Sequence, residues 1–136
     1  MYIYELAFKV RDYECDLQGI VNNSVYQKYL EHTRHEFLIE NGISFSDLHD
    51  QGVDAVVARV DISYKTSLRP GDSFLCRLGV KKEGVKYVFH QDILRQPDNA
   101  VCIKAKVETV TVINGKLAKG FPSFDELVAR SEAAEK

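Results

Sequence analysis

The chain has 136 residues, the length of one ordinary domain with a single core, and we expect residues 1–136 to form one such domain. Its formal net charge of -2 gives no overall electrostatic reason to expect a nucleic acid or an anionic membrane as a partner. No apolar run approaches the roughly 18 residues that a membrane span requires. The three cysteines Cys15, Cys76 and Cys102 are widely spaced without a C-x-x-C pair, which favours a reducing, cytoplasmic compartment.

The first third of the chain predicts a strand, a polar loop and a long helix. The stretch "YIYELAFKV" is rich in the aromatic and β-branched residues typical of strands. From Ser24 onward apolar residues recur at helical spacing, which predicts a helix of about 17 residues and ~26 Å. Ser24 with Gln27 is typical of a capping box, Asn22 or Asn23 are alternative caps, and Gly42 suits the end of the helix.

The remainder of the chain alternates between apolar and polar residues. Four stretches do so, "VDAVVARVDISYKT", "SFLCRLGVKK", "VKYVFHQDILRQ" and "AVCIKAKVETVTVI", and short turns join the last three. Such connections predict an antiparallel meander because parallel strands need long crossovers. Asn114-Gly115 indicates a type I′ hairpin that returns a short edge strand at 116–119. Ser123 with Glu126 predicts the start of a short C-terminal helix, with a fraying tail "RSEAAEK".

These elements predict an α+β fold in which a five-stranded antiparallel sheet wraps around one long helix. The stretch with the clearest chemistry is the loop before that helix. Asp16 is followed by Gly19, which permits a tight turn, and then by the helix start, whose unpaired N–H groups can bind a developing oxyanion. A carboxylate beside such donors can activate water or attack an acyl carbonyl, although a loop aspartate at this position is more often only a cap or turn former.

The string D-x-x-G-[IV]-V-x-[NH]-x-x-Y, here "DLQGIVNNSVY", resembles the signature of the hotdog-fold thioesterases of the 4-hydroxybenzoyl-CoA thioesterase type. The order of strand, helix and four strands is similar as well, so the resemblance covers nearly the whole chain. It implies that Asp16 is the catalytic carboxylate, as general base or nucleophile, and that the N–H of Asn23 polarises the thioester carbonyl. Gly19 to Val21 would shape the turn. The resemblance also implies a homodimer or homotetramer with sites at subunit boundaries. We expect no cofactor and no metal.

Many relatives in that family have histidine where this chain has Asn23. The Asn22-Asn23 pair resembles the branch that includes acyl-carrier-protein thioesterases of plant plastids and their bacterial relatives. We therefore expect fatty acyl-CoA or acyl carrier protein thioesters as substrates, in preference to aromatic ones. Val21, Asn22, Tyr26 and Tyr64 are the candidate substrate-binding residues, although tyrosines at such positions are more often plain core.

Several alternatives remain open from the sequence. Glu31 is a rival catalyst, since some hotdog thioesterases use a helix-borne glutamate, and its plain interpretation is a charge pair on the helix. His32 and His35 lack a third ligand and fit a solvated helix face better than a metal site. Turn residues such as Arg69 and Lys82 are candidates for contact with coenzyme A phosphates or an acidic carrier. A non-catalytic acyl-binding protein and a 3-hydroxyacyl thioester dehydratase are the other functions considered, and the loop has no histidine for the second.

Overall fold

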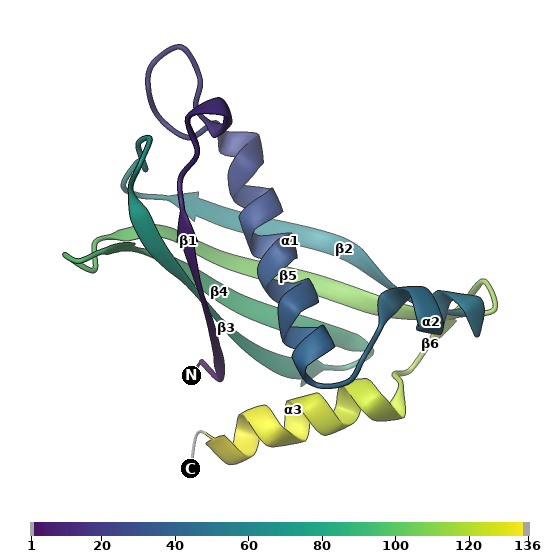
Figure 1. The fold of residues 1–136 in the computed structure, drawn as a ribbon. Helices are drawn as coiled ribbons and strands as arrows, with labels where there is room; N and C mark the ends of the chain where they lie inside the picture. Colours follow the sequence, from purple (N-terminus) through teal and green to yellow (C-terminus); the bar gives the residue numbers. More distant parts are fainter. Residues whose placement is uncertain (1, 135–136) are drawn as a thin grey trace.

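The structure is a computed structural model that describes residues 2–134 (Figure 1). In chain order its elements are β1 (Tyr4–Lys9), the 3-10 turn η1 (Asp12–Glu14), α1 (Asn23–Glu40), α2 (Phe45–Asp50), β2 (Val53–Tyr64), β3 (Ser73–Glu83), β4 (Lys86–Gln96), β5 (Val101–Ile113), β6 (Lys116–Ala118) and α3 (Pro122–Ala134). The four alternating stretches form the four long strands β2 to β5, as predicted from their period of two. None of the helices within residues 2–134 is long and apolar enough to cross a membrane.

The strands form one antiparallel sheet in the order β1-β3-β4-β5-β2, with β6 paired to β5. Within residues 2–134 the sheet therefore has six strands, the five predicted to wrap the helix and the short edge strand predicted at 116–119. The sixth is the hairpin return after Asn114-Gly115, in which both residues have positive φ, as a type I′ turn requires. The predicted meander is confirmed for β3, β4 and β5, whose neighbours in sequence are neighbours in the sheet. The strand that follows the helices, β2, lies at one edge beside β5.

The long helix α1 begins two residues earlier than the capping box suggested. Asn22 has extended backbone angles and is the N-cap, since its side-chain oxygen accepts the N–H of Ser24 at 3.0 Å. Ser24 is therefore inside the helix, where its hydroxyl donates to the same Asn22 oxygen at 2.8 Å. The predicted end is confirmed: Gly42 has a φ of +78° just after the helix, a conformation that glycine adopts without strain.

The helix packs on the concave face of the sheet and divides the core into two apolar clusters (Figure 1). The first lies beneath its N-terminal half and contains Tyr26, Tyr29, Leu30, Phe74, Cys76, Ile93 and Ile103 among others. The second lies beneath its C-terminal half and under α3, and includes Phe37, Leu38, Leu78, Val80, Phe89, Phe124 and Leu127. Buried polar side chains lie between the two clusters, namely Thr33, Arg34 and Gln91.

The C-terminal helix is longer and more firmly seated than predicted. The tail that was expected to fray continues α3 through Ala134, and residues 135–136 lie outside the described part of the chain. Phe124, Leu127 and Val128 are buried in the second cluster. Ser131 is buried as well, and its hydroxyl accepts the N–H of Val80 on β3 at 3.5 Å. Burial against the sheet, which the local sequence does not show, stabilises this last stretch.

The short helix α2 was not predicted. It has only six residues, too few for a helical period to emerge from the sequence. Its cap is Ser44, whose hydroxyl accepts the N–H of Asp47 at 3.3 Å. Phe45 and Leu48 are half-buried against the second cluster, so α2 closes that end of the core between α1 and β2.

Candidate active site

The loop that carries Asp16 is a tight turn closed by its own backbone. Cys15 and Val21 form an isolated antiparallel bridge, and the N–H of Asp16 donates to the carbonyl of Ile20 at 2.9 Å. The N–H of Gly19 donates to the carbonyl of Asp16 at 3.0 Å, and Gly19 has a φ of +75°, which explains the glycine in the motif. The Asp16 side chain is exposed, and its carboxylate accepts one hydrogen bond, from the N–H of Gln18 at 2.8 Å.

Hydrogen bonds from Glu14 hold this turn against α1. The Glu14 carboxylate accepts the hydroxyl of Tyr29 at 2.9 Å and the N–H of Arg11 at 2.8 Å, and its backbone carbonyl accepts the N–H of Asn22 at 3.2 Å. Burial of the Tyr29 hydroxyl, together with its bond to Glu14, raises the pKa of Tyr29, so the hydroxyl stays protonated and donates. The loop therefore has a fixed position relative to the helix start.

One helix N–H beside the loop has no partner. Asn22 serves two of the first helical N–H groups, that of Ser24 through its side chain and that of Val25 through its carbonyl at 2.9 Å. The N–H of Asn23 finds no acceptor among residues 2–134, and it lies at the positive end of the helix dipole. This donor is available to an incoming carbonyl oxygen.

The predicted substrate-binding residues lie at this same end of α1, at different depths. Val21 and Tyr26 are buried in the first cluster, where the Tyr26 hydroxyl accepts the N–H of Leu68 at 3.1 Å. Tyr64, at the end of β2, is exposed; its hydroxyl donates to the carbonyl of Asn23 at 3.4 Å, and its ring centroid lies 5.8 Å from that of Tyr26. The residues predicted to bind substrate therefore do lie at the same end of α1, but Val21 and Tyr26 are packed in the core.

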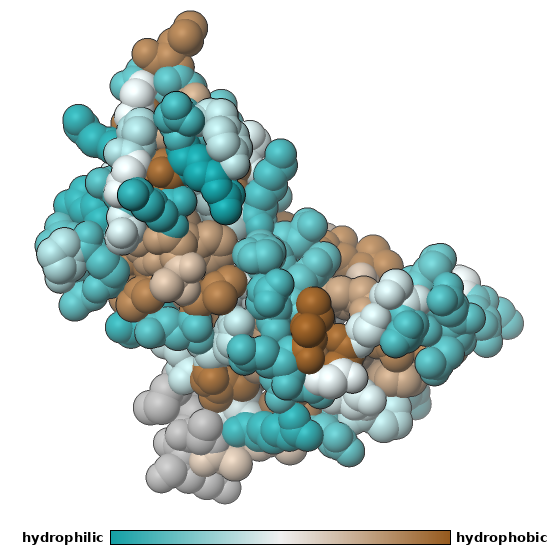
Figure 2. All heavy atoms as spheres, viewed as in Figure 1, coloured by the Kyte–Doolittle hydropathy of each residue, from teal (hydrophilic) through white to brown (hydrophobic). Residues whose placement is uncertain are grey.

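The loop also presents apolar side chains to solvent. Leu17 is fully exposed and Tyr13 is 76% exposed. Figure 2 shows hydrophobic atoms at the tip of the molecule, over the loop that precedes α1. Because contiguous exposed apolar groups mark interaction sites more often than single ones do, this tip is a candidate contact surface.

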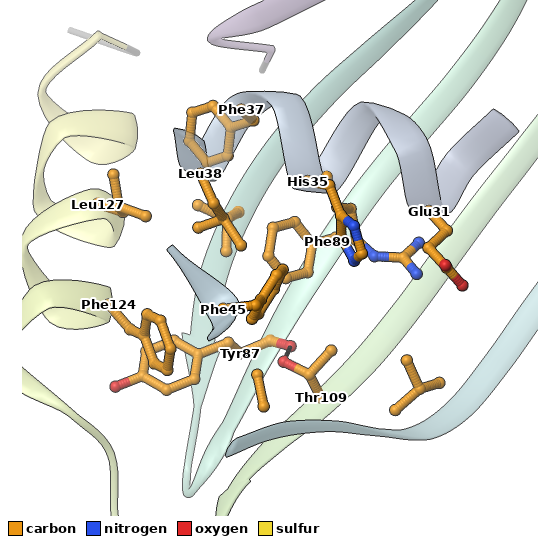
Figure 3. Close-up of a pocket in the computed structure, with 14 residues that line it drawn as sticks. Glu31, His35, Phe37, Leu38, Phe45, Tyr87, Phe89, Thr109, Phe124 and Leu127 are labelled. Atoms are coloured by element: carbon orange, nitrogen blue, oxygen red, sulfur yellow. Dashed lines mark hydrogen bonds between the residues drawn. The ribbon is translucent and has the colours of Figure 1, made fainter. Parts of the chain in front are cut away.

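A cavity of about 240 Å³ lies at the opposite end of α1 (Figure 3). Its wall combines side chains from the C-terminal half of α1, both other helices and four strands, namely Glu31, Arg34, His35, Phe37, Leu38, Phe45, Ala55, Val57, Val80, Tyr87, Phe89, Thr109, Phe124 and Leu127. Aromatic and aliphatic groups predominate, as is typical of small-molecule sites. Of these residues the sequence had singled out Glu31 and His35 as candidates; no local pattern joins the others, because they come from seven separate helices and strands.

Polar groups are concentrated at one end of this cavity. In Figure 3 Glu31 and His35 lie toward one end, and Phe124 and Leu127 lie toward the other. Burial lowers the pKa of His35, so the imidazole is mainly neutral near pH 7. Arg34 is buried, and its Nη1 donates to Oε1 of Gln91 at 3.0 Å. Within residues 2–134 no group of three metal-ligating side chains is close enough to hold an ion.

The lone carboxylate and the cavity are well separated within one chain. Asp16 is not part of the cavity wall, and the two lie at opposite ends of α1 (Figure 1). The helix has 18 residues and is therefore ~27 Å long. Lys82, one of the basic residues considered from the sequence, is engaged elsewhere, because it pairs with Asp125 at 2.9 Å.

Solved structures of other proteins share this arrangement. A hypothetical protein from Aquifex aeolicus matches with a TM-score of 0.85 and 28% identity, over 93% of this chain and 99% of that one. A 1,4-dihydroxy-2-naphthoyl-CoA thioesterase from Synechocystis matches with a TM-score of 0.88 over 95% of this chain and 97% of that one, but at 13% identity it shows the fold alone. The curled antiparallel sheet with its helices is thus that of the hotdog thioesterases.

The sequence comparison assigns the family. The model of the thioesterase-like superfamily matches residues 10–130, so the chain belongs to that superfamily, as the motif around Asp16 suggested. The chloroplastic acyl-acyl carrier protein thioesterase ATL3 of Arabidopsis thaliana is 33% identical over 104 residues, which cover 76% of this chain and 55% of the relative. The chain thus spans about half the length of that curated relative.

Proposed function

We propose that this chain hydrolyses fatty acyl-CoA or acyl-acyl carrier protein thioesters to the free acid and the thiol, with Asp16 as the catalytic carboxylate. The observation that carries the proposal is the pairing of an exposed carboxylate on a fixed turn with the unpaired N–H of Asn23 at the start of α1. Membership of the thioesterase-like superfamily supports the reaction class, and the name of the plant relative supports the substrate class.

The chemistry follows from these two groups. With Asp16 as general base, the carboxylate takes a proton from water as the oxygen attacks the thioester carbon, and the Asn23 N–H stabilises the oxyanion. The C–S bond then breaks and the sulfur leaves as thiolate, which takes up a proton; its pKa of roughly 8.5 makes a dedicated acid unnecessary. With Asp16 as nucleophile, the carboxylate attacks the thioester carbon, the C–S bond breaks and the thiolate leaves; water then hydrolyses the resulting mixed anhydride to the fatty acid and the free Asp16 carboxylate.

The decisive test compares two carboxylate variants. Purified wild type, Asp16→Asn and Glu31→Gln are incubated with acyl-CoA and acyl carrier protein thioesters from short to long chain, and thiol release is followed with a chromogenic disulfide. We expect Asp16→Asn to lose about two to four decades of rate, the scale of a positioned acid–base group. Its stability should stay within about 0.5 kcal/mol of wild type, because the side chain is exposed and asparagine keeps the acceptor for Gln18.

The matched control, Glu31→Gln, removes the other exposed carboxylate of the candidate sites and should retain most of the rate. The opposite result, with full activity in Asp16→Asn and loss in Glu31→Gln, would assign catalysis to the cavity glutamate instead. If wild type binds acyl-CoA tightly but releases no thiol from acyl-CoA or from the acyl carrier protein thioester, the chain is an acyl-binding protein and not a hydrolase.

The position of the cavity supports a site shared between two copies of the chain. The edge strand β2 pairs only with β5 within residues 2–134, so its outer edge is open. Val60 is paired with the buried Val107 of β5 and therefore lies on the same face of the sheet, the face that packs against α1. At the edge of the sheet Val60 is nevertheless 38% exposed. Val56 and Tyr64 are also exposed on β2, at 45% and 47%. We propose that a second copy pairs along this edge as a homodimer and brings its Asp16 loop toward the cavity.

The dimer is tested with a pair of matched lysine substitutions. Val60→Lys places a charge on the β2 edge, and Leu117→Lys places one on β6, where Leu117 is 64% exposed. Light scattering coupled to size exclusion should show a dimer, or a dimer of dimers, for wild type and for Leu117→Lys, and a smaller species with reduced thiol release for Val60→Lys. A fully active monomeric wild type would refute the shared site.

The size and the apolar wall of the cavity favour an acyl group, and not a whole coenzyme A molecule, as its occupant. Its volume of about 240 Å³ is below the roughly 300–1,000 Å³ of sites for drug-sized ligands, and most of its wall is apolar. We further propose a reducing compartment such as the cytoplasm, because Cys15, Cys76 and Cys102 are all unpaired.

A further inference from the structure

We propose that Arg34 is a specificity-determining residue that receives a hydrogen-bond-accepting oxygen on the acyl group of the substrate. The inference rests on the proposed thioesterase function and narrows it, since it selects among acyl groups. Its ligand class is an acyl chain that carries a carboxylate, carbonyl or hydroxyl oxygen in addition to the thioester.

The first support is the burial of an arginine with no acidic partner. Arg34 is only 9% exposed, and a buried cation is costly unless an anion or several acceptors compensate it. No carboxylate within residues 2–134 forms an ion pair with it; Glu31, one turn earlier, only favours the cation at longer range. Burial accordingly lowers the pKa of Arg34 below its ordinary value, and an arginine so placed still keeps its guanidinium charged near pH 7.

The second support is the direction of the free donors. One nitrogen, Nη1, donates to the neutral Gln91. The other two nitrogens have no acceptor within residues 2–134, yet neither is among the fully enclosed unpartnered atoms there, which are Arg77 Nε and Thr111 Oγ1. Since Arg34 forms part of the cavity wall, we infer that these donors face the cavity. A guanidinium presents such donors as a planar fork that suits an oxygen acceptor.

The third support is that Gln91 is itself locked in place. Its Nε2 donates to the carbonyl of Leu30 at 3.0 Å and approaches Sγ of Cys76 at 3.8 Å. The side-chain amide of Gln91 therefore presents its oxygen to Arg34. This hydrogen bond fixes the orientation of the Arg34 guanidinium before a ligand binds. Gln91 is fully buried, between the two apolar clusters. Preorganisation of this kind is characteristic of a recognition group.

The surroundings of Arg34 allow it to distinguish an acyl chain that carries an additional oxygen from a plain alkyl chain. Arg34 lies on α1 between Glu31 and His35, at the polar end of the cavity, and most of the remaining wall is hydrocarbon, including Phe37, Leu38 and Phe89. A plain alkyl chain that fills this cavity leaves the guanidinium without a partner and excludes water from it. An oxygen on the chain compensates the charge instead, and a site built to hydrogen-bond an oxygen rejects the analogue that lacks it.

Binding of non-hydrolysable CoA thioethers, measured by calorimetry, tests the inference without need of catalysis. Three chains of matched length are compared: a plain alkyl chain, one with a hydroxyl or keto oxygen, and one with a terminal carboxylate. For wild type we expect at least one oxygen-bearing chain to bind about tenfold or more tightly than the plain chain, as for a hydrogen bond to a charged group. The tighter of the two oxygen-bearing chains identifies whether the received group is neutral or anionic.

Arg34→Met removes the charge but keeps a side chain of similar volume. It should bring the ratio of affinities between the oxygen-bearing chain and the plain chain close to one. Arg34→Lys, which keeps the charge and loses the fork, should reduce the ratio and serves if the methionine variant does not fold. The control Arg130→Met changes an exposed arginine on α3, bound to Asn41 at 2.8 Å, and should leave the ratio unchanged.

A wild-type ratio near one would overturn the inference, as would a ratio that both Arg34 variants preserve; Arg34 would then be only a structural residue. If wild type releases no thiol from any thioester but keeps the binding preference, the proposed hydrolysis fails and the recognition role of Arg34 stands.

Discussion

The contact between Glu14 and Tyr29 is predicted to hold the Asp16 loop on the helix. The Glu14 side chain is 11% exposed and accepts the Tyr29 hydroxyl at 2.9 Å, while Tyr29 is 4% exposed. Glu14→Ala removes this acceptor and leaves without a partner the hydroxyl of a buried tyrosine whose ring packs against those of Phe8, Phe74 and Tyr26. The other donors to the Glu14 carboxylate, the backbone N–H and the guanidinium of Arg11, are at the surface and can turn to water.

The magnitude follows from these exposures. A buried donor left without a partner costs about 1–3 kcal/mol, so the free energy of unfolding should fall by about 2 kcal/mol in Glu14→Ala. In the Tyr29→Phe background there is no hydroxyl to satisfy, and the same glutamate substitution should cost much less. The coupling energy between Glu14 and Tyr29 should therefore be about 1–2 kcal/mol.

Urea unfolding of wild type, the two single variants and the double variant measures this coupling. The midpoint should shift at an unchanged m-value, which for a chain of this size is about 1–3 kcal/mol/M, so Glu14→Ala should lower the midpoint by about 1 M. Thiol release should fall with it if the loop position matters for Asp16. A coupling energy below about 0.5 kcal/mol, the scatter expected of independent sites, would refute the reasoning.

Two further predictions concern a helix cap and a surface ion pair. Asn22→Ala should cost about 1 kcal/mol of unfolding free energy in urea because the Ser24 N–H loses its acceptor, whereas Asn22→Gly should cost only a few tenths; equal losses would contradict a capping role. His49 Nδ1 lies 2.7 Å from Oδ1 of Asp54, and this bond raises the pKa of His49 above 6.5. The stabilisation is therefore full below pH 6.5 and is lost as the pH rises through the folded-state value, so the melting temperature of wild type should exceed that of His49→Gln most at acidic pH. A gap independent of pH would exclude this linkage.

The elements of the fold could be predicted from the sequence where local rules decide. Alternation set the four long strands, and the hairpin residues Asn114-Gly115 predicted β6. The six-residue α2 was missed because too few residues show a period, and the full length of α3 was missed because it depends on buried contacts such as that of Ser131 with β3. Local propensity is a weak guide where tertiary packing stabilises a helix.

The candidate site likewise has features that the local sequence predicts and features that depend on tertiary packing. The sequence by itself determined the loop with Asp16 and Gly19 and the helix start after it, because turn and helix-start signals act over a few neighbouring residues. Only the tertiary structure decided that Val21 and Tyr26 are core, that Asn22 takes the capping role and leaves the Asn23 N–H free, and that a cavity opens at the far end of α1. The wall of that cavity, and the pairing of Arg34 with Gln91 within it, arise from the curvature of the sheet and the seating of three helices on it. Those depend on contacts between residues distant in the chain, which no local pattern specifies.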